Sequence, residues 1–336
     1  MSSASRPNRR IVLAARPKGS PTLASFRLET VPVPAPADGQ LLLRTLYLSL
    51  DPYMRGRMND AKSYAAKAEI GEVMIGGTVG EVVETHDASF KKGDFVVGML
   101  GWQQFGVASG KALRVIDVKA APAQAYLGAI GMPGVTAWIG LLTIAEPKPG
   151  ETVVVSAASG AVGSVVGQLA KIKGARAVGI AGGAQKCRYV VEELGFDAGV
   201  DYKSPSFIAD LQAATPKGVD VYFENVGGEV LEAVSRRFNF FARMPLCGLV
   251  SQYNEANPAG LRNLHAFLTN RVKLQGFIVS DRPELWPRAL QELASWVGSG
   301  KIKYRETIAQ GLENAPKAFI GMLKGENFGK QLVKLV

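Results

Sequence analysis

Residues 153–183 constrain the fold of this chain more than any other stretch; they read VVVSAASGAVGSVVGQLAKIKGARAVGIAGG. The β-branched run Thr152–Val155 predicts a buried strand, and Ala177–Ile180 predicts a second one. Between them, four apolar residues recur at helical spacing: Val165, Val166, Leu169 and Ile172. The stretch therefore predicts one strand–helix–strand unit of about 30 residues.

Small residues form the predicted turn between the first strand and the helix. Gly160 and Gly163, with Ala161 and Val162 between them, allow a tight turn and a close approach of the backbone to a pyrophosphate. The helix N-terminus that follows offers N–H groups and a favourable dipole to that charge. A merely structural turn can have the same glycine spacing and stays the alternative. In its strand–turn–helix context, the motif predicts dinucleotide binding.

The residues after the second strand bear on which dinucleotide is bound. A cofactor without a 2′-phosphate usually meets an Asp or Glu here, roughly 20 residues beyond the glycines. Residues 181–188 read AGGAQKCR, and the first carboxylate after them is Glu192. Lys186 and Arg188 are cations that would attract a 2′-phosphate, unless both are ordinary solvated helix residues. The sequence favours NADP(H) over NAD(H).

The composition is that of a globular protein with room for two cores: 336 residues, of which 47% are hydrophobic and 20% are charged. No apolar run approaches the ~18 residues that span a bilayer, so no membrane segment is predicted. The net charge is +10, but the basic residues are scattered and do not form a run with interleaved aromatics. Nucleic acid is therefore not an expected partner.

The first thirty residues are rich in arginine, as organellar transit peptides are. Ile11–Ala15 nevertheless fits a first strand better than a signal core, because it is far too short for a hydrophobic targeting region. The two cysteines, Cys187 and Cys247, cannot form a disulfide framework. The expected location is the cytoplasm.

The character of the sequence changes near Tyr126. Before it, short strand-like runs alternate with proline and glycine turns, which predicts an all-β first domain with the form of a compact barrel. After it, strands and helices alternate, which predicts a doubly wound parallel sheet. Its later elements are expected at Val219–Glu224 (strand), Val230–Phe238 (helix), Ala242–Val250 (strand) and Lys273–Val279 (strand). We expect the first domain to be residues 1–127, completed by 300–336, and the second to be 128–299.

Six separated motifs resemble those of the zinc-independent medium-chain dehydrogenases/reductases, and among them the NADPH-dependent alkenal/one reductases. That family includes the prostaglandin reductases, the plant double-bond reductases and the bacterial curcumin reductases. The motifs are DPYMRGRM at 51–58, GMPGVTA at 131–137, GAVG at 160–163, ENVGG at 224–228, CGLVSQYN at 247–254 and GENFGK at 325–330. The resemblance covers nearly the whole chain. It implies a Rossmann NADP-binding domain and a GroES-like β-barrel domain that carries the substrate site.

The zinc-bearing members of this superfamily need ligand sets that this chain lacks. A catalytic zinc needs Cys and His ligands, and the structural zinc needs four closely spaced cysteines. The only histidines are His86 and His265, and neither lies within a Cys spacing. No metal is expected, so reduction needs another group to stabilise the charge that hydride transfer leaves on oxygen.

The resemblance implies how that reduction proceeds. A hydride passes from the nicotinamide to the β-carbon of an α,β-unsaturated ketone or aldehyde, the charge moves to the carbonyl oxygen as an enolate, and the α-carbon is protonated. Tyr253 matches the family's tyrosine near the nicotinamide, where a neutral phenol can donate to that oxygen or relay a proton. Tyr53 is a second candidate from the other domain. Packing roles for both tyrosines stay open.

By motif, the resemblance also implies the cofactor contacts. Gly160–Gly163 would hold the pyrophosphate, and Lys186 with Tyr202 would hold the 2′-phosphate. Cys247 is expected to be a small buried residue and not a nucleophile, because no histidine accompanies it. The nicotinamide side would be lined by Asn225, Cys247, Gly248, Leu249, Val250, Ser251, Tyr253, Phe277, Ile278, Val279 and Asn327.

The sequence thus predicts an NADPH-dependent enone or enal reductase, and by resemblance a homodimer. Two alternatives stay open. One is a quinone oxidoreductase of the same fold, which needs no proton donor at an α-carbon; the other is a non-catalytic, crystallin-like NADPH-binding protein. The size of the substrate is not determined, because the segment Glu255–His265 is shorter than the proline-rich loop found there in relatives.

Overall fold

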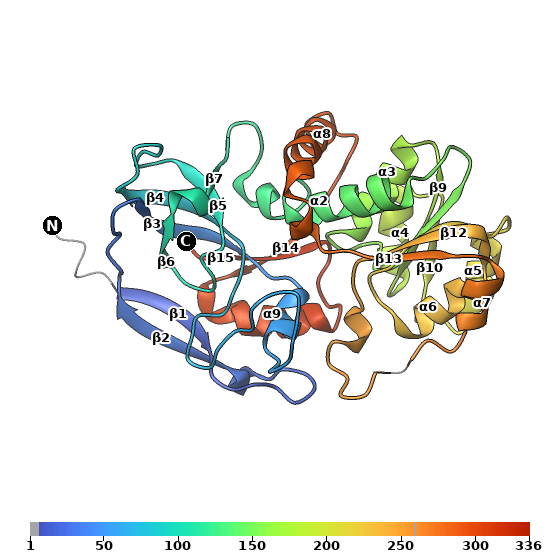
Figure 1. Ribbon diagram of the computed structural model, residues 1–336, viewed down its shortest axis with the longest axis horizontal. Coiled ribbons are helices and arrows are strands. Elements are labelled where there is room, and N and C mark those ends of the chain that lie inside the picture. Colours follow the sequence, from blue (N-terminus) through green and yellow to red (C-terminus); the bar gives the residue numbers. More distant parts are fainter. Residues whose placement is uncertain (1–6, 259) are drawn as a thin grey trace. The chain divides into compact units, whose positions relative to one another are not determined.

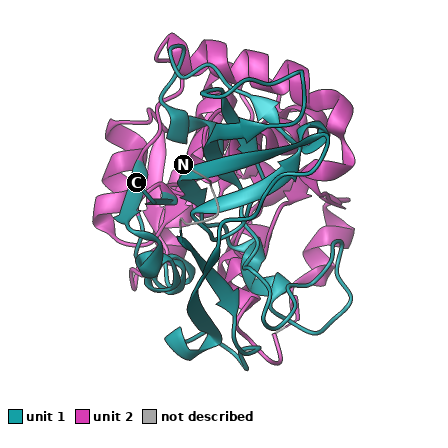
Figure 2. Ribbon diagram, turned by 90° about the vertical axis from the view of Figure 1, so that its left-hand side faces the viewer, with its two compact units in different colours: residues 1–127, 306–327, 331–336 teal, residues 128–305, 328–330 magenta. Residues whose placement is uncertain are grey.

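The computed structural model of the chain describes residues 7–258 and 260–336. It divides into two compact units (Figure 2): unit 1 comprises residues 1–127, 306–327 and 331–336, and unit 2 comprises residues 128–305 and 328–330. None of the helices in the described part of the chain combines the length and the apolar character that crossing a bilayer requires.

Unit 2 contains a six-stranded sheet in which every strand pair is parallel (Figure 1). The strand order is β10-β9-β8-β11-β12-β13, which is the order of a Rossmann sheet. The predicted doubly wound sheet is therefore confirmed. The strands are β8 (Thr152–Val155), β9 (Arg176–Ala181), β10 (Ala198–Asp201), β11 (Val219–Phe223), β12 (Phe238–Leu246) and β13 (Lys273–Gly276).

Helices cover both faces of this sheet, as its apolar strands require. All four residues of β8 are buried. Figure 1 shows α2 and α3 along one side of the sheet and α6 and α7 along the other. The helices of unit 2 are α2 (Met132–Ile139), α3 (Gly163–Ile172), α4 (Ala184–Glu192), α5 (Phe207–Ala214), α6 (Gly228–Ser235), α7 (Leu264–Thr269) and α8 (Trp286–Gly298).

The boundary between α6 and β12 differs from the sequence prediction. The helix expected to reach Phe238 ends at Ser235, and the strand expected at Ala242–Val250 covers Phe238–Leu246. Phe238 explains the shift, because its ring packs edge-on to Phe267, with ring centroids 5.4 Å apart, in the core beneath the sheet. Tertiary packing therefore places this aromatic residue in the strand and not at the end of the helix.

Unit 1 is rich in antiparallel strands. A seven-stranded sheet has the order β14-β15-β3-β4-β5-β7, with β6 also paired to β3, and β1 and β2 form a separate antiparallel pair. The strands are β1 (Pro7–Leu13), β2 (Phe26–Pro32), β3 (Gln40–Ser49), β4 (Thr78–Thr85), β5 (Phe95–Gly98), β6 (Phe105–Ser109), β7 (Arg114–Val115), β14 (Glu306–Gln310) and β15 (Lys330–Lys334). This is the β-rich, GroES-like part of the fold.

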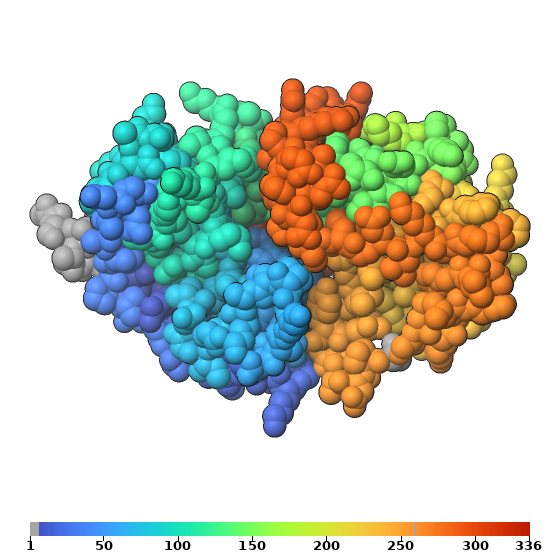
Figure 3. Space-filling model, in the orientation of Figure 1, coloured from blue at the N-terminus to red at the C-terminus, as the bar shows by residue number. Residues whose placement is uncertain are grey.

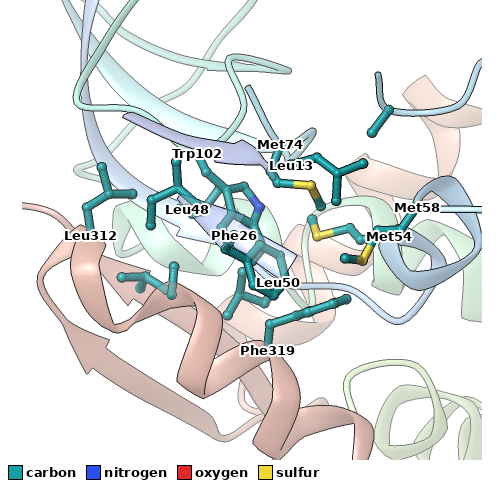
Figure 4. Packing of buried hydrophobic residues seen from close by; sticks show 14 of the residues in the cluster. Leu13, Phe26, Leu48, Leu50, Met54, Met58, Met74, Trp102, Leu312 and Phe319 are labelled. Carbon is teal, nitrogen blue, oxygen red and sulfur yellow. The ribbon is translucent and has the colours of Figure 1, made fainter. Parts of the chain in front are cut away.

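Three aromatic rings centre the core of unit 1 (Figure 4). Phe26 stacks on Trp102 with ring centroids 5.4 Å apart, and Phe319 packs edge-on against Trp102 at 5.7 Å. Trp102 and Phe319 are fully buried. Such offset and edge-on pairs add to the stabilisation that burial of their apolar area already gives.

The expectation of an all-β first domain was wrong, because unit 1 also contains two helices. They are α1 (Tyr53–Arg57) and α9 (Ala315–Leu323). In α9, Ala315, Phe319 and Met322 are buried, and their spacing places them on one face of the helix. That face packs into the core described above, which is why this part of the predicted all-β domain folds as a helix.

Candidate cofactor-binding site

The turn between β8 and α3 leaves almost no space for side chains. Ala157 takes up the left-handed backbone conformation, with φ +51°, and the Gly160 N–H donates to its carbonyl oxygen at 2.9 Å. A Cβ on Gly163 would lie 2.3 Å from that oxygen, and one on Gly160 would lie 3.1 Å from it. The predicted glycines therefore allow a tight backbone turn around the Ala157 carbonyl oxygen. This turn leads into the N-terminus of a buried helix, where N–H groups can bind an anion.

A short C-terminal segment, residues 328–330, lies against this turn. The Gly329 N–H donates to the Ser159 carbonyl at 3.1 Å, and Gly329 forms a parallel bridge with Gly160. The Lys330 N–H donates to the Arg305 carbonyl at 2.8 Å. Gly329 has φ +69°, and a Cβ there would lie only 1.9 Å from the Arg305 oxygen, so no other residue fits this contact.

Basic and aromatic residues gather at the carboxyl ends of β9 and β10. A Cβ on Gly182 would lie 2.9 Å from the Tyr202 ring and 3.1 Å from the Lys203 side chain. Burial lowers the pKa of Lys186, and the charge of Lys203 lowers it further. The two ammonium groups therefore lie close enough to repel each other, which a dianionic ligand would relieve. The sequence prediction included Lys186 and Tyr202 but missed Lys203, although it directly follows Tyr202.

The carboxylate at this place accepts hydrogen bonds from the backbone. Asp201 Oδ1 accepts hydrogen bonds from the backbone N–H groups of Gly183, at 2.8 Å, and Lys203, at 2.9 Å. It stabilises the loops after β9 and β10 and serves as an acceptor for the backbone. The arrangement favours an anion over a ribose hydroxyl, as expected for a 2′-phosphate.

A buried carboxyl group joins strand ends where the strand order reverses. Glu224 follows β11 and is fully buried; its Oε1 accepts from Ser156 Oγ at 2.8 Å and from the Val226 N–H. Burial raises the pKa of Glu224. Asn225 donates from Nδ2 to the Ser156 carbonyl at 2.9 Å and from its N–H to Ser156 Oγ at 2.8 Å. Ligands of open α/β sheets bind at such a point. The family motif at 224–228 includes Glu224, but the sequence predicted no role for it or for Ser156.

The segment after β12 is bonded to the same loop. The N–H groups of Cys247 and Gly248 donate to the Glu224 carbonyl at 2.9 and 3.2 Å, and Val250 N–H donates to the Asn225 carbonyl at 3.1 Å. Burial and the nearby Glu224 raise the pKa of the Cys247 thiol to about 12. A thiol with that pKa is protonated at neutral pH and is a poor nucleophile.

Tyr253 follows a short 3₁₀ helix, Val250–Gln252, and its hydroxyl turns back toward that segment. The Leu249 N–H donates to the Tyr253 hydroxyl oxygen at 3.4 Å. A Cβ on Gly248 would lie 3.0 Å from the same oxygen, so the small residue makes room for the phenol. A phenol can accept at its oxygen and still donate its own proton.

Residues 277–279 follow β13 and line the same edge of the sheet. The Phe277 ring packs edge-on to Phe223, with centroids 6.2 Å apart, and a Cβ on Gly140 would lie within 3 Å of both rings. Ile278 is partly buried, and the Val279 carbonyl accepts from Trp286 Nε1 at 3.1 Å. Unit 2 thus brings the predicted residues after β8, β9, β10, β11, β12 and β13 to one edge.

Two of the predicted site residues, Tyr53 and Asn327, belong to unit 1. Tyr53 begins α1, and burial, with a smaller contribution from Asp51, raises the pKa of its phenol well above the ordinary value. Asn327 lies in the turn between α9 and β15.

The residues of unit 2 fit an NADP(H) cofactor. The turn at Gly160–Gly163 supplies the narrow backbone cradle that a pyrophosphate needs, and the cations near Tyr202 supply the charge for a 2′-phosphate. Within residues 7–258 and 260–336, no group of three or more His, Cys, Asp or Glu side chains could hold a metal ion.

Two family models match the chain. One is described as the N-terminal domain of oxidoreductase and matches residues 9–116; the other is described as zinc-binding dehydrogenase and matches residues 161–295. The first lies in unit 1, and the second lies in unit 2.

Close relatives match along nearly the whole chain. The NADPH-dependent curcumin reductase of Escherichia coli (strain K12) is 50% identical over 334 residues, which are 98% of this chain and 97% of the relative. The 2-alkenal reductase (NADP(+)-dependent) of Nicotiana tabacum is 39% identical over 332 residues, 97% of each chain. The crystal structure of CurA in complex with NADPH from Vibrio vulnificus is 48% identical, with a TM-score of 0.94 over 98% of this chain and 99% of that chain.

Proposed function

This chain belongs to the NADPH-dependent alkenal/one reductases of the zinc-independent medium-chain dehydrogenases/reductases, and from that premise we propose how it reduces a C=C bond. The substrate is an α,β-unsaturated ketone or aldehyde. When bound, NADPH would supply a hydride to its β-carbon. The electron pair of the C=C bond would move to the bond between the α-carbon and the carbonyl carbon, and that of the C=O bond to oxygen, which gives an enolate. A proton then adds to the α-carbon, so the product is the saturated carbonyl compound.

Tyr253 is the residue that we assign to the substrate oxygen. The observation that carries this assignment is the position of its hydroxyl at the carboxyl edge of the sheet, 3.4 Å from the Leu249 nitrogen and in a segment bonded to Glu224 and Asn225. A donor held in this way stabilises the charge that develops on oxygen without reorganising. Tyr53 is the second candidate donor, and burial raises the pKa of its phenol further above neutral pH.

The cofactor roles follow from the same edge. Gly160, Ala161, Val162 and Gly163 hold the pyrophosphate, and Lys186 with Tyr202 holds the 2′-phosphate. Asn225, residues 247–253 and residues 277–279 would line the nicotinamide, and Asn327 is a further proposed contact. The hydrogen bonds between residues 247–251 and residues 224–226 support this assignment, because they fix the backbone on which the ring would rest.

An isotope experiment tests the reaction itself. The enzyme reduces a 2-enone with NADPH that carries deuterium at the transferable position of C4, and the product is examined by NMR. We expect deuterium at the β-carbon and, in D2O with unlabelled NADPH, deuterium at the α-carbon. Label at the carbonyl carbon would instead identify a carbonyl reductase and would contradict the proposal.

We also propose that the chain forms a homodimer in the cytoplasm. Strand β13 ends the sheet, and all four of its residues are exposed; Figure 3 shows the orange segment that contains α7 and β13 at the surface. Phe240, Phe241 and Leu274 are also exposed there, and Arg271 lies over both phenylalanine rings. An open strand edge with apolar neighbours favours pairing with an identical edge around a two-fold axis.

Light scattering during gel filtration tests the dimer. The parent should elute as a dimer, and Leu274→Arg should shift it toward monomer, because the charge would be buried between the copies. Leu23→Arg, at an exposed leucine of unit 1, is the matched control and should leave the mass unchanged. A monomeric parent would contradict the proposal.

A further inference from the structure

Arg305 lies over two aromatic rings, Phe328 and Tyr189, which are not among the cofactor-binding residues proposed above. Its guanidinium carbon is 4.3 Å from the centroid of the Phe328 ring and 5.9 Å from that of Tyr189. Phe328 packs edge-on against Tyr189 with centroids 4.8 Å apart. The Lys186 ammonium is 6.0 Å from the same Phe328 centroid. Arg305 and Lys186 therefore lie around one ring, Phe328.

The backbone holds this arrangement against the glycine turn. The Arg305 carbonyl accepts from the Lys330 N–H, and the close contact with Gly329 leaves no space for another residue. Gly329 in turn donates to Ser159, the residue before Gly160. Arg305 is thus linked through residues 328–330 to the predicted pyrophosphate cradle, although it is distant from that cradle in the sequence.

Arg305 and Lys203 lack an acidic partner among the residues that the structure describes. Within residues 7–258 and 260–336, neither Arg305 nor Lys203 has a carboxylate within 4.0 Å, whereas Arg243 and Arg288 each pair with a glutamate. Stacking on an aromatic face holds a guanidinium in place without neutralising it. Cations gathered in this way suit a ligand with several negative charges.

We propose that Arg305 is a third cation for the 2′-phosphate of NADPH, beside Lys186 and Lys203, and that Phe328 holds its guanidinium in position. The planar guanidinium can donate two hydrogen bonds to a phosphate. Selection of NADPH over NADH then depends on the C-terminal segment as well as on the loops after β9 and β10. The proposal rests on the NADPH cofactor and not on which acceptor is reduced.

Binding measurements without any acceptor test this role. Dissociation constants for NADPH, NADH and 2′,5′-ADP are measured by titration calorimetry for the parent and for Arg305→Gln. We expect Arg305→Gln to raise the dissociation constants of NADPH and 2′,5′-ADP roughly tenfold and to change that of NADH less than about twofold. Arg305→Lys should recover part of the loss, and the salt dependence of NADPH binding should be shallower in the Gln variant.

Two further variants separate this role from general stability. Phe328→Leu keeps Arg305 but removes the aromatic ring on which it stacks. This variant should weaken the binding of NADPH more than the binding of NADH. Arg288→Gln, an exposed arginine 5.5 Å from the Trp138 centroid, is the matched control and should bind both cofactors like the parent. Equal weakening of NADPH and NADH by Arg305→Gln, or no weakening of either, would overturn the proposal. Absence of enone reduction in a protein that still binds NADPH would affect only the proposed reaction.

Discussion

Ser156 Oγ donates a hydrogen bond of 2.8 Å to Glu224 Oε1, and this bond joins the carboxyl ends of β8 and β11. Because β8 and β11 are the two strands at which the order of the sheet reverses, the pair lies at the point where open α/β sheets generally bind their ligands. The same glutamate accepts from residues 226, 247 and 248 through its side chain and its carbonyl. One buried carboxyl group thus organises the backbone on which we place the nicotinamide.

Glu224 should make folding stability depend on pH. Its pKa lies above the ordinary value of 4.5, chiefly because the group is buried, so the folded state favours the protonated form. Its contribution to stability is complete below pH 4.5 and is lost as the pH rises through the folded-state pKa. Glu224→Gln cannot ionise. The melting temperature of Glu224→Gln, relative to that of the parent, should therefore be higher at about pH 8 than at about pH 5. An equal difference in melting temperature at the two pH values would contradict this prediction.

Removing the Glu224 side chain should be more severe than neutralising it. Glu224→Ala leaves the hydroxyl of Ser156 and the N–H of Val226 without their acceptor in a buried place. The expected cost is roughly 2 kcal/mol in the free energy of unfolding, together with weaker NADPH binding. Urea unfolding and cofactor titration measure the two effects, and a variant as stable as Glu224→Gln would refute the hydrogen-bonding role.

Gly163→Ala should disrupt the glycine turn. Its Cβ would lie 2.3 Å from the Ala157 carbonyl oxygen, so the backbone must move at the proposed pyrophosphate site. We expect the NADPH dissociation constant to rise at least about tenfold and the melting temperature to fall. Gly298→Ala is the matched control, since a Cβ there meets nothing within 4 Å at the end of α8. That variant should melt no lower than the parent, and unchanged NADPH binding in Gly163→Ala would contradict the prediction.

Lys186→Ala should reduce the preference for NADPH. The ammonium would face a 2′-phosphate, which NADH lacks, so the KM for NADPH should rise roughly tenfold or more while the KM for NADH stays unchanged. The lowered pKa of Lys186 adds a second expectation: NADPH binding by the parent should weaken at a lower pH than an ordinary lysine would allow. Lys217→Ala, at an exposed lysine of the same unit, serves as the control. Equal losses for both cofactors would exclude a role for Lys186 at the 2′-phosphate.

Tyr253→Phe should separate catalysis from cofactor binding. Loss of the phenolic hydroxyl removes the proposed donor to the enolate oxygen, and we expect kcat to fall about 10²-fold with NADPH affinity within about twofold of the parent. Tyr126→Phe, which loses a hydroxyl bonded to the Asp117 carbonyl in unit 1, should retain full activity. If Tyr253→Phe is fully active and Tyr53→Phe is not, the donor role belongs to Tyr53.

The strand–helix–strand unit was predictable because its signals are local. The buried β-branched residues of β8, the helical spacing from Val165 to Ile172 and the glycines of the turn all lie within one short stretch. The boundaries of α6 and β12 were not predictable in the same way, because Phe238 is placed in the strand by its contact with Phe267. Helix α9 was missed for the same reason. Its buried face packs against Phe26 of β2 and Trp102 of the loop before β6, which are distant in the sequence.

In the candidate site, too, residues in local motifs were predictable, and residues placed by long-range contacts were not. The motifs that resemble the family indicated Lys186, Tyr202 and Tyr253, because each motif is a short run of neighbouring residues in the sequence. Long-range contacts indicated the others: the cluster of Arg305 and Phe328 depends on residues 328–330 returning to the glycine turn, which no periodicity reveals. Lys203 had a signal, its place next to Tyr202, which was not used.

The rate of NADPH oxidation with three acceptors tests whether this enzyme reduces a C=C bond with NADPH. The acceptors are a medium-chain 2-enal or 2-enone, a naphthoquinone and the matching saturated aldehyde, each measured with NADPH and again with NADH. Turnover of the unsaturated carbonyl compound alone, with a strong preference for NADPH, is the result that we predict. Preference for the naphthoquinone would identify a quinone oxidoreductase, and no turnover of any acceptor despite tight NADPH binding would identify a non-catalytic protein; either result would contradict the account.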